Sequence, residues 1–382
     1  MTGKRIKKIL VFIHEYPPVG GGGGRISQNL CRGLVKSGYQ IQVVTARFGE
    51  SPAIENCDGV IIHRLWSNRK VQYRADFSAM IFYVLASFFK GIKLIREWKP
   101  DILHAHFAVP AGATTWALSK FTHLPYIITA HGGDVPGAAP EKTDRWFRFV
   151  MPFTYGIWKN AVKVVAVSDQ TKQLAYQYYD VDMNVIGNGI DLDRLTPGKF
   201  EPNKKPHIIF AGRFSPEKNP LAIIHTLAKL EDLDWDCTLL GDGLLFQDAK
   251  RIINQHNLGR RIKLTGWISE DEVTEWFKKS DILFMPSLTE GLPLTGLKAL
   301  ATGLAVVLSN VGGCSNLVKE NVNGFLVEPG DIDGYSKALR KLLIDPHRLL
   351  KFRKNSYKFS KSFTIKAVVE SYTKLLNEIS KN

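Results

Sequence analysis

The sequence PSLTEGLPLTGLKALATG runs from Pro286 to Gly303 and follows the short apolar segment Asp281 to Met285. The apolar segment predicts a buried strand, the Gly and Pro residues predict a turn, and the Ala- and Leu-rich end predicts a helix. A parallel strand that leads through a glycine-bearing turn into a helix N-terminus is where α/β proteins hold anions. One acid, Glu290, and one base, Lys298, lie in this stretch. It is therefore a candidate site for charged ligands.

The same alternation of strands and helices continues on both sides of this stretch, and it predicts an α/β fold with parallel sheets covered on both faces. A chain of 382 residues also exceeds what one hydrophobic core usually serves. Pro, Gly, Asp and Lys residues accumulate over residues 191–205, as in a linker. We therefore expect two doubly wound domains, residues 1–195 and 196–364. The remaining residues, 365–382, carry an amphipathic helix with apolar positions at helical spacing.

The predicted elements follow from apolar runs and their spacing. In the first half the expected strands are residues 6–13, 41–45, 60–65, 101–104, 126–129 and 162–167. The expected helices there are residues 25–36, 77–98, 111–121, 146–158 and 169–178. In the second half the expected strands are residues 208–211, 237–240, 262–264, 282–285, 305–308 and 325–327, with helices in the intervals.

The net charge of +15 is unusually basic for a chain with 23% charged residues. Residues 1–195 carry 24 Lys and Arg against 15 Asp and Glu, and residues 196–382 carry 27 against 21, so no single basic tail explains the excess. A dispersed excess suits an anionic partner such as a phosphate ligand or an acidic membrane surface. Simple solubility explains it equally well. No helix-turn-helix, zinc-finger or RNA-binding signature is present, so we expect no nucleic-acid partner.

The four cysteines are widely spaced and form no C-x-x-C pair, which argues against a disulfide framework or a zinc site and favours a reducing compartment. The basic N-terminus leads directly into a short predicted strand rather than a signal core. The most apolar run, Met80 to Phe89, is shorter than the roughly 20 residues that span a bilayer. We therefore expect a cytoplasmic protein, with contact to the inner face of the membrane as an open alternative.

The predicted helix from Phe77 to Trp98 is the segment that could make such a contact. It mixes aromatic residues with nearby bases at Arg74, Lys90, Lys93 and Arg96. That composition is typical of an interfacial membrane helix. A core-facing helix of an α/β domain has nearly the same pattern, so both interpretations stay open.

Three further stretches combine residues that can bind anions or reacting groups. Gly20 to Gly24 follow the first strand, where backbone N–H groups and a helix dipole could close on an anion, although a flexible loop is the alternative. Arg213 and Lys218 flank a turn after the first strand of the second half, so both could reach one phosphate. His131 follows a predicted strand of the first half. His104 and His106 share a strand end, but no third ligand nearby suggests a metal, and His104 is expected to pack or hydrogen-bond.

With these pieces in place, the chain resembles a family 4 glycosyltransferase of the GT-B architecture over nearly its whole length. One such motif would be weak, but eight in the family's order are specific. They are Tyr16–Arg25, Thr129–Asp134, Asn188–Asp191, Ala211–Asn219, Leu239–Gly243, Leu264–Ile268, Ser287–Gly303 and Asn323–Asp331.

The resemblance implies two Rossmann-like domains facing each other across a cleft, with the last helix crossing back to the first domain. It also implies a retaining transferase that needs no metal or other cofactor. By that analogy Arg213 and Lys218 clamp the diphosphate of a nucleotide-sugar donor, while His131 and Glu290 act at the donor sugar. The remaining donor-binding positions are Gly22, Gly23, Gly266, Gly291, Leu292, Pro293, Leu294 and Thr295.

Two positions depart from the family's pattern. Lys298 stands where the family's E-x7-E motif has a second glutamate that accepts hydrogen bonds from the nucleotide ribose, and a lysine cannot accept. Asn316 ends Gly312-Gly-Cys-Ser-Asn316, where the family has G-G-x-P-E. The resemblance implies transfer of a hexose-type sugar from a UDP- or GDP-linked donor to a glycan or lipid-linked acceptor, in surface polysaccharide or glycolipid synthesis. The alternative is a non-catalytic paralogue that binds nucleotide or a partner enzyme.

Overall fold

A computed structural model describes residues 6–72, 75–136, 153–201, 203 and 205–381. The chain divides into two compact units, each described below by itself. Unit 1 comprises Met1–Gly189 and Ile365–Asn382, and unit 2 comprises Ile190–Thr364. The chain thus passes from unit 1 to unit 2 after residue 189, six residues before the expected boundary at residue 195. Ile190 is the cause, because its side chain is 3% exposed in the core of unit 2 and its N–H donates to the carbonyl of Phe363 at 2.8 Å.

Unit 1 contains an eight-stranded sheet in the order β3-β4-β2-β1-β5-β6-β7-β8. All neighbouring strands are parallel except β3 and β4. The antiparallel pair turns at Asp58 and Gly59, which both have positive φ, so an Asp-Gly hairpin closes this edge. The strands are β1 (Lys8–Phe12), β2 (Gln40–Ala46), β3 (Ile54–Cys57), β4 (Val60–Leu65), β5 (Ile102–His106), β6 (Tyr126–Ala130), β7 (Lys163–Ala166) and β8 (Met183–Val185).

Helices cover both faces of this sheet because alternate strand residues are buried on opposite sides. Ile9 and Val11 pack in a cluster with α1 and α12, whereas Leu10 and Phe12 pack in a second cluster with α2 and α3. The helical elements of unit 1 are α1 (Gly22–Lys36), α2 (Phe77–Trp98), η1 (Ala108–Gly112), α3 (Ala113–Thr122), α5 (Asp169–Tyr176) and α12 (Ile365–Ile379). The predicted helix 146–158 lies partly outside the described residues; positions 153–159 are helical.

The C-terminal helix α12 belongs to unit 1 although the chain reaches it only after completing unit 2. Val369, Tyr372, Leu375 and Leu376 are buried, as the helical spacing of the sequence predicts. Val369 packs so closely on α1 that a Cβ placed on Gly33 would lie 2.4 Å from its Cγ2. The glycine in α1 therefore permits the close packing of the two helices.

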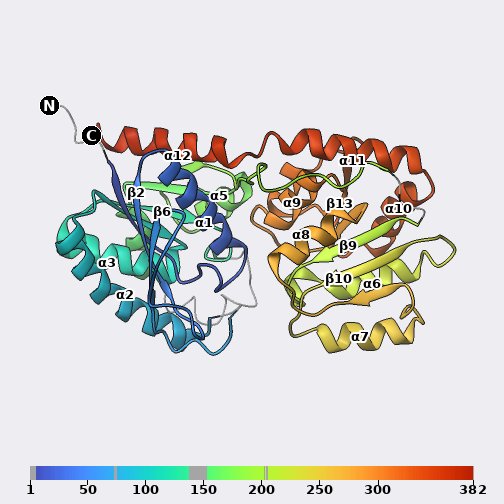
Figure 1. Ribbon diagram of the computed structural model, residues 1–382, viewed down its shortest axis with the longest axis horizontal. Helices are drawn as coiled ribbons and strands as arrows, with labels where there is room; N and C mark the ends of the chain where they lie inside the picture. The colour runs from blue at the N-terminus through green and yellow to red at the C-terminus, as the bar shows by residue number, and fades with distance from the viewer. Residues whose placement is uncertain (1–5, 73–74, 137–152, 202, 204, 382) are drawn as a thin grey trace. The chain divides into compact units, whose positions relative to one another are not determined.

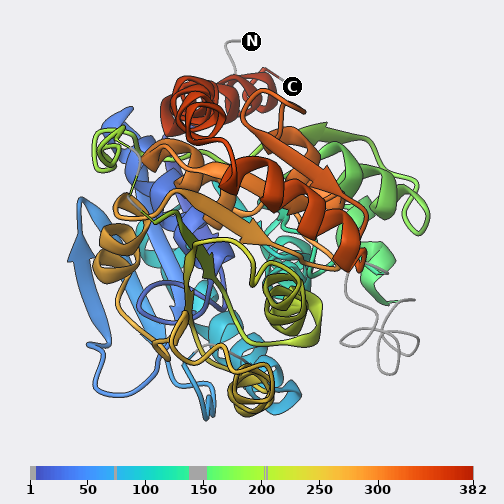
Figure 2. The ribbon, with the colours of Figure 1, turned by 90° about the vertical axis from the view of Figure 1, so that its right-hand side faces the viewer.

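Unit 2 contains a six-stranded parallel sheet in the order β11-β10-β9-β12-β13-β14. α6, α7 and α10 cover one face, and α8 and α9 cover the other (Figure 1 and Figure 2). The strands are β9 (His207–Ala211), β10 (Asp236–Leu240), β11 (Ile262–Leu264), β12 (Ile282–Met285), β13 (Ala305–Ser309) and β14 (Gly324–Val327). The helical elements are η2 (Pro216–Lys218), α6 (Pro220–Ala228), α7 (Phe246–Gln255), α8 (Glu270–Lys278), α9 (Leu294–Thr302), η3 (Gly312–Leu317), α10 (Ile332–Leu343) and α11 (Pro346–Ser360).

A buried ion pair ties the far end of unit 2 together. Asp281, which precedes β12, is fully buried and accepts from Arg353 Nη1 of α11 at 2.7 Å and from the backbone N–H of His207 at 2.9 Å. The Arg353 side chain is only 3% exposed. These contacts compensate the buried carboxylate of Asp281 at the amino end of the central strand. Ligands of such sheets bind at the opposite, carboxyl ends of the strands.

Candidate donor-binding site

In unit 2 the candidate residues lie in the loops that follow β9 and β12, neighbouring strands at the centre of the sheet. Lys218 of η2 donates from Nζ to Oε1 of Glu290 at 2.5 Å, and Ser287 donates from Oγ to the same oxygen at 2.9 Å. The side chains of Lys218 and Glu290 are 23% and 7% exposed. The structure thus joins two predicted site residues that are 72 positions apart in sequence.

Arg213 lies in the same loop as Lys218 and also has an acidic partner. Its Nη2 is 3.7 Å from Oε1 of Glu217, a buried carboxylate, while Arg213 itself is about one-third exposed. The carbonyl of Glu217 accepts from the N–H of Leu288 at 2.8 Å, which fastens the β9 loop to the β12 loop. Two cations, each held by one carboxylate, therefore stand at the carboxyl end of the sheet.

The predicted run Gly291 to Thr295 forms the turn into α9. The carbonyl of Gly291 accepts from the N–H of Gly313 at 2.5 Å, and a Cβ on Gly313 would lie 2.3 Å from that carbonyl oxygen, so only glycine fits. Pro293 precedes the helix and no side chain caps its first N–H groups. Amides at a helix start that lack intrahelical partners, together with the helix dipole, favour an anion at this position.

Cys314 connects this turn to the segment where the sequence departs from G-G-x-P-E. The thiol is buried, and burial together with the nearby Glu290 carboxylate raises its pKa well above the usual value. Cys314 is therefore a neutral packing residue beneath the ion pair. Asn316, the other altered position, is exposed in η3.

Lys298 contacts α8. It is 6% exposed, forms an ion pair with Oε1 of Glu270 and donates to Thr274 Oγ1 at 3.2 Å. Glu270 is the first residue of α8 and is more exposed than Lys298, with 38% of its side chain accessible. Glu270 was not predicted from the sequence, although it lies four residues after the predicted donor-binding position Gly266. A lysine at position 298 together with a carboxylate at the start of the preceding helix, α8, is the signal that could have revealed it.

Gly266 shapes the loop before α8. It has φ +71°, and its carbonyl accepts from the N–H of Gly241 at 3.0 Å, which joins the ends of β10 and β11. A side chain at Gly241 would lie 2.0 Å from the carbonyl of Gly212. Trp267, next in the loop, is 49% exposed. An exposed aromatic ring beside a glycine turn is suited to stacking on a base.

In unit 1 the candidate His131 follows β6 and belongs to a histidine cluster that includes His104 and His106 at the end of β5. His106 Nδ1 and His131 Nε2 are 3.0 Å apart, and the rings of His104 and His106 have centroids 4.3 Å apart. The sequence shows no third ligand near His104 and His106, because His131 is 25 residues from His106 along the chain and comes close to it only through the pairing of β5 with β6. The prediction that His104 hydrogen-bonds is confirmed, since its Nε2 contacts Thr129 Oγ1 at 2.8 Å.

Burial keeps this cluster uncharged. It lowers the pKa of His131 to about 4 and that of His104 to about 3, and it lowers the pKa of His106 well below its usual value. Asp134 holds the strand end by accepting from the N–H groups of His131 at 2.9 Å and Ala108 at 2.7 Å. The buried Nδ1 of His131 has no protein partner among the described contacts. A neutral imidazole with that atom unpaired can accept or donate a hydrogen bond to a ligand.

Three residues of the glycine run lie in α1, which begins at Gly22 and not at the expected residue 25, so the alternative of a flexible loop does not describe these three. A Cβ on Gly24 would lie 2.6 Å from the carbonyl oxygen of Glu15, and one on Gly23 would lie 2.4 Å from Cζ of Phe107. These two glycines therefore permit close packing of the helix start. Gly22 has open space around its Cα, so it remains able to approach a ligand.

A carboxylate already sits beside this helix start. Glu15 accepts from the N–H of Gly21 at 3.2 Å and lies 3.7 Å from both His14 Nε2 and Arg69 Nη2. The contact agrees with the expectation that these amides attract negative charge. Glu15 was missed from the sequence, where an acid just before Tyr16–Arg25 was the available signal.

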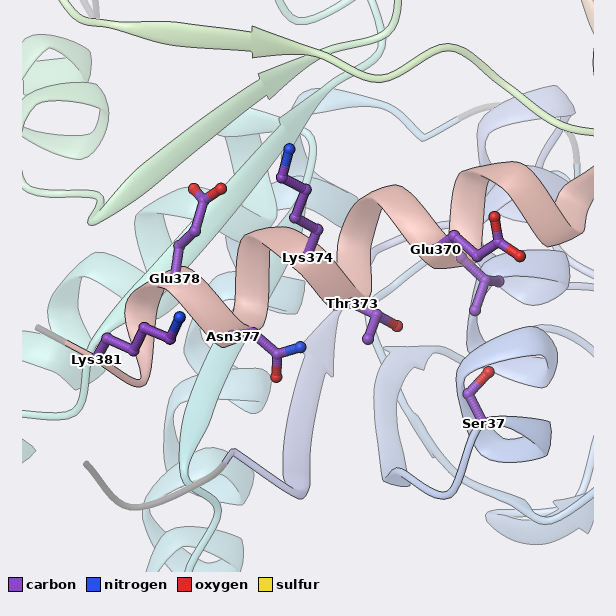
Figure 3. Close-up of a pocket in the computed structure, with 8 residues that line it drawn as sticks. Ser37, Glu370, Thr373, Lys374, Asn377, Glu378 and Lys381 are labelled. Carbon is purple, nitrogen blue, oxygen red and sulfur yellow. The ribbon is translucent and has the colours of Figure 1, made fainter. Parts of the chain in front are cut away.

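A surface hollow between α12 and the end of α1 is unrelated to these residues (Figure 3). Its lining alternates acidic and basic side chains of α12, including Glu370, Lys374, Glu378 and Lys381. Glu378 lies 3.6 Å from Lys163, the first residue of β7, so the hollow is near the amino ends of the strands. Ligands of open parallel sheets bind at the opposite ends. In the described part of the chain, no group of three or more His, Cys, Asp or Glu residues is arranged to hold a metal ion.

Two family models match the chain, one over each half. The family model "Glycosyltransferase Family 4" matches residues 20–194, and the model "Glycosyl transferases group 1" matches residues 191–359. An uncharacterized glycosyltransferase of Methanocaldococcus jannaschii is 26% identical over 98% of this chain and 99% of its own length. The UDP-Gal:alpha-D-GlcNAc-diphosphoundecaprenol alpha-1,3-galactosyltransferase of Escherichia coli is 28% identical over 66% of this chain and 69% of its own length.

Among solved structures, sucrose-phosphate synthase of Thermosynechococcus elongatus superposes with a TM-score of 0.85 at 20% identity, covering 98% of this chain and 99% of that one. At this identity the likeness establishes the fold, which is the two-domain, Rossmann-like GT-B fold predicted from the sequence. The two family matches, one for each half of the chain, together with this fold indicate a family 4-like glycosyltransferase.

Proposed function

We propose that the protein is a retaining glycosyltransferase that moves a hexose-type sugar from a UDP- or GDP-linked donor to a glycan or lipid-linked acceptor. The observation that carries the proposal is the Lys218–Glu290 pair at the turn into α9, with Arg213 in the adjoining loop. This arrangement offers cations and helix amides to a diphosphate and a carboxylate to sugar hydroxyls. The galactosyltransferase relative, by its name, uses a UDP-sugar and a diphosphoundecaprenol-linked acceptor, which supports the same chemical class.

The charges suggest how transfer would be promoted. Departure of the nucleoside diphosphate builds negative charge on its oxygens. Lys218 and Arg213, already held in place by Glu290 and Glu217, would stabilise that charge without a large rearrangement. Glu290 would then accept hydrogen bonds from the donor sugar. The proposal needs no metal, because side-chain cations and the start of α9 supply the positive potential.

His131 would act on the sugar as a neutral group. With a pKa of about 4 it carries no charge at neutral pH, and its unpaired Nδ1 can hydrogen-bond a hydroxyl. His106 would fix the orientation of the ring through the contact with Nε2. Gly22, at the start of α1, has open space around it and would approach an anionic group of the ligand.

Recognition of the ribose is proposed to use Glu270. Lys298 cannot accept a hydrogen bond, but its ion pair with Glu270 holds a carboxylate at the end of the Gly266–Trp267 loop. The carboxylate would accept from ribose hydroxyls, while Trp267 stacks on the base. Donor binding would then be retained in spite of the exchange at position 298.

Transfer assays with UDP- and GDP-linked sugars and lipid-linked or oligosaccharide acceptors test the proposal. We expect nucleotide release that depends on the acceptor, and a product whose anomeric configuration, measured by NMR, matches the donor. An inverted product contradicts the retaining mechanism. Nucleotide binding by calorimetry without release from any donor would instead favour the non-catalytic paralogue, which Lys298 and Asn316 make the second candidate.

We further propose a cytoplasmic location. All four cysteines are free, and three of them are buried as thiols, which a reducing compartment preserves. Fractionation of cells that produce the tagged protein tests this, and recovery from an exported fraction would contradict it.

A further inference from the structure

The outward side of α2 carries a continuous apolar face. Phe77, Ile81, Phe82, Leu85 and Phe89 are 57%, 45%, 39%, 52% and 71% exposed, and their spacing places them on one side of the helix. Scattered apolar residues are normal on a protein surface, but a contiguous group of large ones marks an interaction site.

Two neighbouring aromatic residues extend this face. Trp66, just after β4, is 65% exposed and its ring centroid lies 5.1 Å from that of Phe82. Phe121 of α3 is 74% exposed and packs edge-on against Phe88 at 5.6 Å. Figure 1 shows α2 and α3 side by side in unit 1. Together with the five residues of α2, they form what we call the α2 face.

The opposite side of α2 is fixed in the fold. Tyr83 donates to the carbonyl of Val44 at 3.0 Å, Ser87 contacts Thr114 at 2.9 Å, and a Cβ on Gly91 would lie 2.5 Å from Leu118. By length and composition alone α2 could cross a membrane, with 22 residues and a mean hydropathy of 1.6 over its best window. Since its inner side is anchored to the sheet, it can present only its outer side to lipid.

Basic residues adjoin the apolar residues at the C-terminal end of α2. Phe77, Ile81, Leu85 and Phe89 follow one another at intervals of four, and Lys93, 64% exposed, is next on the same line. Arg96 is also exposed there. Glu97 is the single acidic residue of α2, and its Oε1 lies 3.8 Å from Lys93 Nζ. Apolar rings adjoining lysine and arginine suit acyl chains beneath anionic headgroups.

We propose that the α2 face binds the surface of an anionic membrane, with its aromatic and aliphatic side chains in the interfacial layer and Lys93 and Arg96 at the headgroups. Charge complementarity favours this occupant over a second copy, because a second copy also has a net charge of +15, whereas anionic headgroups are opposite in charge to Lys93 and Arg96. The inference goes beyond the transfer reaction and does not depend on it.

Vesicle flotation tests the proposal with the purified full chain. We expect binding to vesicles containing phosphatidylglycerol, and binding at least tenfold weaker to vesicles of phosphatidylcholine alone or at high salt. Leu85→Gln with Phe89→Gln should lower the partition coefficient at least tenfold. Lys93→Glu with Arg96→Glu should lower binding to the anionic vesicles by about fivefold or more for each base.

Ile344→Gln is the matched control, because Ile344 is 61% exposed in unit 2 and should leave binding unchanged. Thermal unfolding and circular dichroism establish that each variant is folded. The proposal is overturned if binding is absent, if it does not respond to the α2 substitutions, or if the protein resists alkaline extraction as a spanning protein does. Dimers in sedimentation velocity that the Leu85 and Phe89 substitutions dissolve would also overturn it and assign the face to a second copy.

Discussion

The carboxyl ends of the two sheets differ in how they handle charge. Unit 1 gathers buried imidazoles that burial keeps neutral, with pKa values of about 4 for His14 and His131. Unit 2 gathers full charges in pairs, Lys218 with Glu290 and Arg213 with Glu217. A neutral imidazole can exchange hydrogen bonds with a hydroxyl at little electrostatic cost, whereas a diphosphate needs fixed cations. The contrast is the basis for proposing that His131 hydrogen-bonds a sugar hydroxyl and that Lys218 and Arg213 bind a diphosphate.

The largest expected effect that distinguishes the units is acid sensitivity. Folded His14, His104 and His131 have pKa values of about 4, 3 and 4, below the unfolded value of 6.5. As the pH falls below 6.5, the unfolded state takes up protons that the folded state cannot, so stability is lost from pH 6.5 down to about 4 for His14 and His131 and down to about 3 for His104. Each histidine contributes up to about 1.4 kcal/mol per pH unit. We therefore expect unit 1 to lose several kcal/mol between pH 7 and pH 5.

Asp134 opposes this loss in part, because burial raises its pKa to about 6 and the folded state then binds a proton before the unfolded one does. Hydrogen exchange followed by mass spectrometry at pH 7 and pH 5, corrected for intrinsic rates, resolves the two units. Amides of β5 and β6 should lose protection more than those of β9 and β12. Equal losses in both units would mean that the imidazoles are not held neutral.

A second prediction concerns the paired charges. Lys218→Met should lower kcat/KM about 10²–10³-fold, or roughly 2.7–4 kcal/mol, because it removes a preorganised cation and leaves the buried Glu290 without it. Lys229→Met is the matched control. Lys229 also pairs with an acid at 2.7 Å, but both side chains are more than half exposed, so activity should be unchanged. Equal activity of the two variants would remove Lys218 from the phosphate site.

The third prediction tests Glu270. Considered from sequence alone, Lys298→Glu should tighten nucleotide binding by restoring the missing acceptor. The contact with Glu270 reverses that expectation, because two carboxylates would then meet beside α8. We expect Lys298→Glu to weaken binding of UDP or GDP about tenfold, and Lys298→Glu with Glu270→Lys to recover most of it. Calorimetry gives a coupling of about 0.5–3 kcal/mol if the residues act together. Additive effects would place the ribose elsewhere.

Local sequence patterns predicted much of this structure. Apolar runs located the central strands, and the helical spacing from Phe77 to Trp98 predicted α2 with both of its ends. The four-residue strand β3 was missed although Asp58-Gly59 is a strong hairpin signal. β8 was missed because three residues are too few to show a period.

Long-range pairing accounts for what the sequence could not predict at the site. The family motifs predicted Lys218 and Glu290 as separate site residues. They form an ion pair because β9 and β12 are neighbours in the sheet. Likewise, His131 is neutral because it is buried in the folded protein, and the residue type alone does not predict that burial. The role of the glycines near Gly24 could not be predicted from composition, because glycine is the residue required both for a close packing contact and for a flexible loop.

The smallest expected effect separates the structural part of the histidine cluster from its functional part. Tyr372 of α12 places its hydroxyl 2.8 Å from Thr129 Oγ1, which in turn contacts His104. Tyr372→Phe removes one buried hydroxyl and leaves the Thr129–His104 contact in place. It should lower the stability of unit 1 by about 1 kcal/mol, the usual net value of one hydrogen bond. Because His131 is oriented by His106 and not by this chain of contacts, kcat/KM should remain unchanged. A lowered kcat/KM with unchanged donor affinity would instead extend the functional cluster from His131 to the C-terminal helix.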